Sequence, residues 1–240
     1  MSQVLSSVAR QSTFVPHIAG VFQHRQSRLR TDSATSSTTP LDIPTVFVVD
    51  NDVSVRESLT LLITLAGWKV ETFASAQEFL ARPRVLTANC LVLEVSLPDL
   101  SGLELQERVA ADRVEMPIIF ITGNGDIPMT VRAMKAGALE FMTKPFDEKV
   151  LLSAIRCGLE QSRAALGQNA EMQVLRTRHG SLTFREREVM ELVVSGLLNK
   201  QIALKLGISE ITVKAHRGKV MQKMQVDSLA GLVKAADRLQ

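Results

Sequence analysis

The sequence has few of the features that mark secreted or membrane proteins. It contains two cysteines, Cys90 and Cys157, which lack the spacing of metal ligands and are too sparse for a disulfide framework. So low a cysteine content is typical of a protein in a reducing compartment. No segment reaches the roughly 18 uninterrupted apolar residues that a transmembrane helix requires. We therefore expect a cytoplasmic protein with no membrane contact.

A strong overall charge is also absent, because the 240 residues carry a formal net charge of only +3. The chain is long enough for one or two domains with their own cores. Its two halves differ in charge: residues 45–160 hold 11 basic against 16 acidic side chains, whereas residues 181–240 hold 10 against 6. This asymmetry predicts that only the C-terminal half contacts nucleic acid.

Residues 1–44 have a polar composition without any sustained hydrophobic period. They are rich in serine, threonine and glutamine, and they hold four arginines against two acids. This composition predicts a disordered leader. Two alternatives stay open, which are an arginine-rich organelle transit peptide and a start codon assigned upstream of the true one.

From Thr45 onward, apolar runs with strand character alternate with helical patterns. The expected strands cover 45–50, 68–73, 90–94, 116–122 and 138–142. The expected helices cover 53–66, a segment opened by Ser75, 103–109, 126–136 and a segment that begins at Asp147. Strands that alternate with helices form parallel βαβ units with right-handed crossovers. We therefore expect an α/β domain over 45–160 with a doubly wound, five-stranded parallel sheet.

Polar side chains stand at the ends of four of these strands. An acid after a strand is often only a helix cap, and a single lysine is usually solvated. Because the carboxyl ends of parallel strands meet at one edge of a sheet, we nevertheless expect these side chains to converge there. They are Asp50, Asn51 and Asp52 after the first strand, Glu94 at the end of the third, Thr122 at the end of the fourth, and Lys144 after the fifth.

The segment around Glu94 resembles a known family. CLVLEVSLPDLSG at 90–102, VVDND at 48–52 and TKPF at 143–146 are together similar to the receiver domains of two-component response regulators. The resemblance covers residues 45–160 and implies a flavodoxin-like fold. It places Asp50 and Asp52 in an acidic pocket that holds Mg²⁺. It also implies that Thr122 and Lys144 contact a phosphoryl group and that Phe141 is an aromatic switch.

Two positions depart from the family pattern. Glu94 stands where the family has its phosphoacceptor aspartate, and Asn51 stands where most members have a second adjacent acid that binds the metal. The extra methylene moves the carboxylate more than about 1 Å, and misplacements of this size reduce rates on the order of 100-fold. Asn51 removes a charge from a site that favours carboxylates. We therefore predict a receiver that is independent of phosphorylation, and Mg²⁺ binding that is weak or absent at Asp50 and Asp52.

Three alternatives to this interpretation stay open. Glu94 could still accept phosphate from a sensor histidine kinase, as in an ordinary response regulator. The domain could instead take a small molecule or a protein partner as its input. The D-x-D pattern of Asp50 and Asp52 also resembles that of haloacid-dehalogenase-like phosphatases, which are enzymes. That pattern alone is a weak signal, so we predict no enzymatic activity.

The C-terminal segment predicts an all-α, four-helix DNA-binding domain over 181–240. Thr183 and Glu186 form a capping box before its first helix, Asn199 starts the second, and the turn at 207–209 precedes the third. The stretches REREV, GLLNKQIA, LGIS and TVKAH resemble the LuxR-type domain of the FixJ/NarL class. Residues 161–180 are the expected helical linker, with fraying at Ser162, Gly167 and Asn169.

Helical spacing divides the third helix of this domain into two sides. Val213, His216, Val220 and Met224 fall on the inward face. The outward side is basic and carries the small Gly218, so we expect it to enter the major groove of double-stranded DNA. The predicted contacts are Lys200, Thr212, Lys214, Ala215, Arg217, Gly218 and Lys219.

The last helix, 228–239, carries an apolar stripe of Leu229, Leu232, Val233 and Ala236. In the family, part of this face forms a two-fold contact, so we expect a homodimer at least on DNA, with paired half-sites. Burial within the monomer is the alternative. The whole chain is therefore predicted to be a cytoplasmic DNA-binding transcriptional regulator, whose input partner is a sensor histidine kinase or another molecule.

Overall fold

The computed structural model describes residues 43–113 and 115–239. The predicted leader lies outside these residues, except for its last two positions. Among the described residues, no helix combines the length and the apolar character needed to cross a membrane. The predicted cytoplasmic location stays a prediction.

The first domain is built on a five-stranded parallel sheet, as predicted. Its strands are β1 (Thr45–Val49), β2 (Lys69–Phe73), β3 (Asn89–Glu94), β4 (Ile118–Thr122) and β5 (Glu140–Thr143). They are ordered β2-β1-β3-β4-β5, and every neighbouring pair is parallel. The three inner strands are buried along their whole length because helices cover both faces of the sheet.

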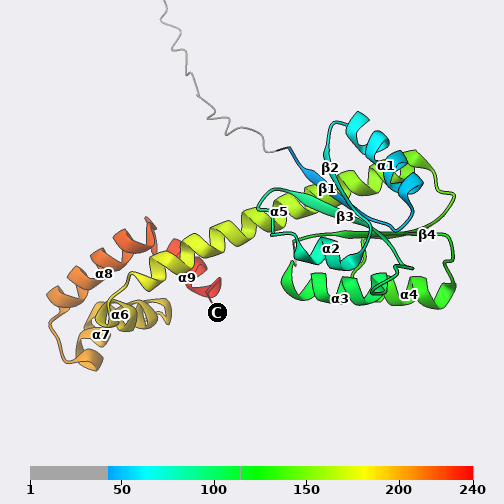
Figure 1. Ribbon diagram of the computed structural model, residues 1–240. Helices are drawn as coiled ribbons and strands as arrows, with labels where there is room; N and C mark the ends of the chain where they lie inside the picture. Colours follow the sequence, from blue (N-terminus) through cyan, green and yellow to red (C-terminus); the bar gives the residue numbers. More distant parts are fainter. Residues whose placement is uncertain (1–42, 114, 240) are drawn as a thin grey trace, which may run out of the picture. The chain divides into compact units, whose positions relative to one another are not determined.

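Helices form a layer on each face of this sheet (Figure 1). On one side lie α1 (Val53–Leu65) and the first part of α5 (Glu148–Gly180), which share a core with alternate strand residues such as Val48 and Val92. On the other side lie α2 (Ala76–Ala81), α3 (Gly102–Asp112) and α4 (Ile127–Lys135), which pack on Phe47, Leu91 and Phe120. The domain is therefore the expected doubly wound α/β fold.

Helix α5 corrects the prediction for the linker. It runs without a break through residues 161–180, so the fraying expected at Ser162, Gly167 and Asn169 does not occur. Ser162 is fully buried. The first part of the helix packs in the core of the first domain through Leu159, and its last part packs in the core of the second domain through Leu175. Tertiary packing overrides the weak local propensity of these residues.

The second domain consists of α6 (Phe184–Val194), α7 (Asn199–Leu206), α8 (Glu210–Met224) and α9 (Leu229–Asp237). The predicted capping box of Thr183 and Glu186 is present before α6, and Ser209 caps α8. Gly207 ends α7 in the left-handed conformation, with φ at 64°, which glycine adopts without steric cost. A core formed by all four helices and the end of α5 holds the domain together.

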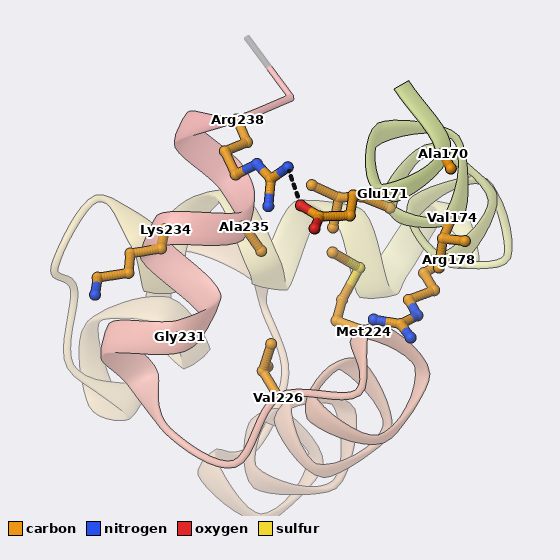
Figure 2. A pocket seen from close by; sticks show the side chains of 11 residues that line it. Ala170, Glu171, Val174, Arg178, Met224, Val226, Gly231, Lys234, Ala235 and Arg238 are labelled. Carbon is orange, nitrogen blue, oxygen red and sulfur yellow. Dashed lines mark hydrogen bonds and ion pairs between the residues drawn. The ribbon is translucent and has the colours of Figure 1, made fainter. Parts of the chain in front are cut away.

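An open groove of about 560 Å³ lies between the end of α5 and helices α8 and α9. Its apolar surface includes Val174, Met224 and Val226, and Arg238, the residue that follows α9, donates to Glu171 of α5 at 3.0 Å (Figure 2). Both of these charged side chains are largely exposed, so the pair contributes at most about 1 kcal/mol. The apolar contacts of Leu175 and Met172 hold this end of α5 on the domain.

Glu186 ties α6 to α8 inside the second domain. Its carboxylate is 4% exposed, and it accepts hydrogen bonds from Lys223 Nζ at 2.6 Å and from the backbone N–H of Thr183 at 2.8 Å. These bonds, that of Lys223 foremost, lower the pKa of Glu186 from 4.5 to about 2. A folded-state pKa below the unfolded value means that ionised Glu186 stabilises the domain above about pH 4.5, and that this stabilisation is lost as the pH falls toward 2.

Glu186→Gln should therefore lower the free energy of unfolding by about 1–3 kcal/mol at neutral pH, since a buried charge-assisted hydrogen bond is lost. The difference from the native chain should shrink as the pH falls below 4.5. Urea unfolding of the full chain, followed by circular dichroism at several pH values, measures both effects. Glu191→Gln, at an exposed position of the same helix, is the control. A loss that stays constant down to pH 3 would contradict this account.

Candidate functional site

The polar strand ends converge at one edge of the sheet, as predicted. Val49 of β1 pairs with Leu93 of β3, so the next residues, Asp50 and Glu94, lie side by side. On the other side of β3, Thr122 pairs with Thr143, the residue before Lys144. The backbone N–H of Lys144 also donates to the carbonyl oxygen of Thr122 at 2.8 Å. Parallel register alone therefore brings these residues together from four strands.

Lys144 lies between two buried carboxylates. Its Nζ is 2.6 Å from Asp50 Oδ2 and 2.8 Å from Glu94 Oε2. The side chains of Asp50 and Glu94 are 1% and 7% exposed, and that of Lys144 is 22% exposed. Burial acts to lower the pKa of Lys144, but the hydrogen bonds to Asp50 and Glu94 outweigh it and raise the pKa. We call these three residues the carboxylate–lysine cluster.

The remaining oxygens of the cluster also have partners. Asp50 Oδ1 accepts from the backbone N–H of Asp52 at 2.9 Å, and Glu94 Oε1 accepts from that of Ser96 at 3.1 Å. Each of the four carboxylate oxygens therefore receives a hydrogen bond from the protein. Two carboxylates that are buried away from water require hydrogen bonds of this kind to every oxygen.

The residues that the resemblance assigns to Mg²⁺ are engaged by other groups of the chain. Lys144 places a positive charge beside Asp50, and each oxygen of Asp50 already accepts one hydrogen bond. Asn51 and Asp52 are exposed, and Asp52 caps α1 by accepting from the backbone N–H of Ser54 at 2.8 Å. Within residues 43–113 and 115–239, no group of three or more His, Cys, Asp or Glu side chains is placed to hold a metal. Weak or absent Mg²⁺ binding stays a prediction.

Among the described residues, no hydrogen bond joins Glu94 to Thr122 or to Phe141, the two other residues that the resemblance assigns to the response. Thr122 is 1% exposed, and its Oγ1 accepts from the backbone N–H of Asn124 at 3.3 Å. Phe141 is half-buried, with its ring centroid 5.9 Å from that of Phe120. Of the three residues predicted to act on the output side, only Lys144 is therefore bonded to Glu94.

Three further residues shape this edge, and the sequence analysis missed two of them. Arg56 Nη1 donates to the carbonyl oxygen of Asp50 at 2.6 Å, and Ser96 supplies the backbone N–H already described. Only the fold reveals these contacts, since Arg56 lies on α1 and Ser96 lies in a loop. Gly102 was noted as part of a motif, and its role is now clear. A Cβ there would lie 2.5 Å from the carbonyl oxygen of Glu94, so only glycine allows α3 to start this close to β3.

Helix α8 has the two sides that its sequence predicts. Val213, Val220 and Met224 are fully buried, and His216 is half-buried. The exposed residues include most of the predicted DNA contacts, namely Thr212, Lys214, Ala215, Gly218 and Lys219. A Cβ at Gly218 would meet nothing within 4 Å, so glycine is not required there by packing inside the monomer. Lys200, at the start of α7, is exposed as well.

Arg217 differs from the other predicted contacts because it already has a partner. Its Nη1 donates to Asn199 Oδ1 at 2.6 Å, and both residues are half-buried. Asn199 begins α7, so this bond fixes the guanidinium of Arg217 relative to the preceding helix. From the sequence, Asn199 was predicted only to start a helix. Its amide side chain was the available signal, but its partner is 18 residues away.

The predicted stripe of α9 is only partly on the surface. Leu229 is 45% exposed, and Val233 and Ala236 are half-buried. Leu232 is 2% exposed and belongs to the core of the second domain, so its assignment to a dimer contact is corrected. Its side chain faces the helices of its own domain because the four-helix core needs an apolar cover.

Comparisons with known proteins agree with both halves of this description. The family model "Response regulator receiver domain" matches residues 46–156, and "Bacterial regulatory proteins, luxR family" matches residues 180–236. Nodulation protein W of Bradyrhizobium diazoefficiens is 47% identical over 194 residues, which are 81% of this chain and 86% of that protein. Transcriptional regulatory protein FixJ of the same organism is 41% identical over 193 residues, which are 80% and 94%.

A solved structure of the response regulator StyR extends the likeness to three dimensions. It is 53% identical, with a TM-score of 0.73 over 82% of this chain and 99% of that chain. The fold, the exposed basic side of α8 and these relatives all point to the same family. The chain belongs to the DNA-binding response regulators that join a receiver domain to a LuxR-type helix-turn-helix domain.

Proposed function

We propose that this chain is a transcriptional regulator, not an enzyme, whose receiver domain acts without phosphorylation because Glu94 stands at the phosphoacceptor position. The observation that carries the proposal is the carboxylate–lysine cluster, in which Lys144 bonds Asp50 and Glu94 together. Phosphoryl transfer needs a correctly placed attacking oxygen and cations that offset the charge of the transferring group. Here the extra methylene of Glu94 displaces the attacking oxygens, and Lys144 is already engaged by two carboxylates.

Glu94 takes over part of the role that a phosphoryl group has in the family. The resemblance assigns two contacts to that group, with Lys144 and with the hydroxyl of Thr122. Glu94 makes the first at 2.8 Å, while Thr122 Oγ1 is bonded to Asn124 instead. Glu94 brings one charge and two oxygens, whereas a phosphoryl group brings up to about two charges and three oxygens. We propose that Glu94 biases the receiver toward its active state, but incompletely.

The opposite effect of the same ion pair is the main alternative. A bridge between Glu94 and Lys144 could hold the inactive state, because the value of a buried ion pair depends on its surroundings. The two proposals predict opposite changes in DNA affinity when Glu94 loses its charge. The geometry favours the first, since the partner of Glu94 is the lysine that a phosphoryl group would use.

The output side follows from the second domain. We propose that α8 enters the major groove of double-stranded DNA and that Lys200, at the start of α7, contacts phosphate. A homodimer on paired half-sites would use Leu229, Val233 and Ala236, which sedimentation of the protein–DNA complex would report. A sensor histidine kinase or another input partner could still bind the receiver.

The two exposed lysines should differ in their effects on DNA binding. Lys214→Ala should weaken binding to a selected cognate duplex by about 1–3 kcal/mol while changing binding to a scrambled duplex less, because a base contact is lost. Lys200→Ala should weaken both complexes alike and reduce the salt dependence. Fluorescence anisotropy titrations at several salt concentrations measure this. Lys234→Ala, exposed on α9, is the matched control. Unchanged affinity in both variants would overturn the docking proposal.

Phosphodonors should leave the native protein unmodified. Incubation with acetyl phosphate and Mg²⁺ should give no acid-labile phosphate, because the extra methylene of Glu94 misplaces the attacking oxygen, Lys144 is engaged by two carboxylates, and Asn51 supplies no metal charge. Glu94→Asp alone should restore little, whereas Glu94→Asp combined with Asn51→Asp should restore much more. Phosphate-affinity gels with intact-protein mass spectrometry give the extent of modification. Robust phosphorylation of the native chain would show an ordinary response regulator.

Removal of the charge at Glu94 should weaken DNA binding without any phosphodonor. Glu94→Gln and Glu94→Ala should each raise the Kd for a cognate duplex by about fivefold or more, as expected for an ordinary coupling between two sites. Glu107→Gln, at an exposed position of α3, should have no effect. Tighter binding in both variants would support the inactive-state lock. No change in either would show that Glu94 carries no signal.

A further inference from the structure

Helix α5 contacts β3 at two residues one helical turn apart. Ser162 Oγ accepts a hydrogen bond from the backbone N–H of Asn89 at 3.0 Å, and both residues are buried. At Gly158, a Cβ would lie only 2.9 Å from Cys90 Sγ and 3.1 Å from Leu139 Cδ2. The helix is therefore seated on the first two residues of β3 by one hydrogen bond and one close approach. We call Gly158 and Ser162 the β3 seat.

The strand and the helix at this seat each reach a functional part of the chain. β3 begins at Asn89 and ends at Glu94, whose carboxylate belongs to the carboxylate–lysine cluster. α5 passes the seat and ends in the second domain, where Leu175 is buried in the core. Among the described residues, α5 is the one element that contributes to the cores of both domains.

Ordinary helix packing does not require the hydroxyl at the seat. Apolar residues of α5 such as Leu151, Ile155 and Leu159 already fill the core beneath it. A serine in a helix commonly turns its hydroxyl to its own backbone or to water. Ser162 instead serves as acceptor for the buried N–H that opens β3, an N–H that would otherwise lack a partner at a position away from water.

We infer that Gly158 and Ser162 are positioning residues that couple the β3 strand to the linker helix, so that the state of Glu94 alters DNA binding through this seat. The inference rests on the proposed function, in which Glu94 biases the receiver. It adds the contact through which a change at Glu94, on β3, affects the linker helix α5. A displacement of β3 at Glu94 can move α5 only if the contacts of Gly158 and Ser162 keep the helix fixed against the start of the strand.

A double-variant cycle on the full chain tests this inference. The measured quantity is the ratio of Kd values of Glu94→Gln and the native chain for one cognate duplex, without phosphodonor. In the Ser162→Ala background this ratio should fall from about fivefold or more toward one. Ser153→Ala, at an exposed position of the same helix, should leave the ratio unchanged. Gly158→Ala, which crowds Cys90, should also reduce the ratio.

The outcomes separate this inference from the function on which it rests. A ratio that persists in the Ser162→Ala background overturns the seat and leaves the role of Glu94 intact. A ratio of one in the native background overturns both. Hydrogen exchange of residues 158–168 is the second readout. Ser162→Ala should speed exchange there more than Ser153→Ala, while circular dichroism stays native because alanine favours the helix. Equal exchange in the two variants would also overturn the seat.

Discussion

The first domain depends on one ammonium group that neutralises two buried carboxylates. Asp50 and Glu94 end neighbouring strands, and their side chains are almost completely buried. Burial of two carboxylate charges this close together would be strongly unfavourable without a cation between them. Lys144 supplies it, and removal of one partner from such a buried arrangement typically costs about 3–5 kcal/mol. Lys144 therefore joins the carboxylates of Asp50 and Glu94 at this edge of the sheet.

The two residues that depart from the family pattern are placed differently. Glu94 bonds Lys144 inside the cluster, whereas neutral Asn51 is exposed outside it. Under the proposed function, this receiver keeps Lys144, Thr122 and Phe141, which respond to a phosphoryl group in the family, while Glu94 replaces the residue that would be phosphorylated. The second domain keeps an exposed basic face on α8. Under the proposed function, the carboxylate of Glu94 always biases the receiver toward its active state, but only in part, and this bias sets the affinity for DNA.

Much of this arrangement could be predicted from the sequence, because strand periodicity and parallel topology decide which residues meet at a sheet edge. The polar strand ends, the capping box of Thr183 and the two sides of α8 were all correct. The continuity of α5 was not predictable, since Ser162 is stabilised by Asn89 on a distant strand. Leu232 was misplaced for a similar reason. Spacing shows that an apolar face exists, but only the packed domain shows which residues it buries.

The central claim is that Glu94 and Lys144 act on DNA binding as one unit. Its most direct test is a double-mutant cycle of Glu94→Gln and Lys144→Met, read as affinity for a cognate duplex without phosphodonor. The account predicts that each single variant weakens binding and that the double variant is no weaker than Lys144→Met alone. Additive losses, or tighter binding in the Glu94 variant, would contradict it.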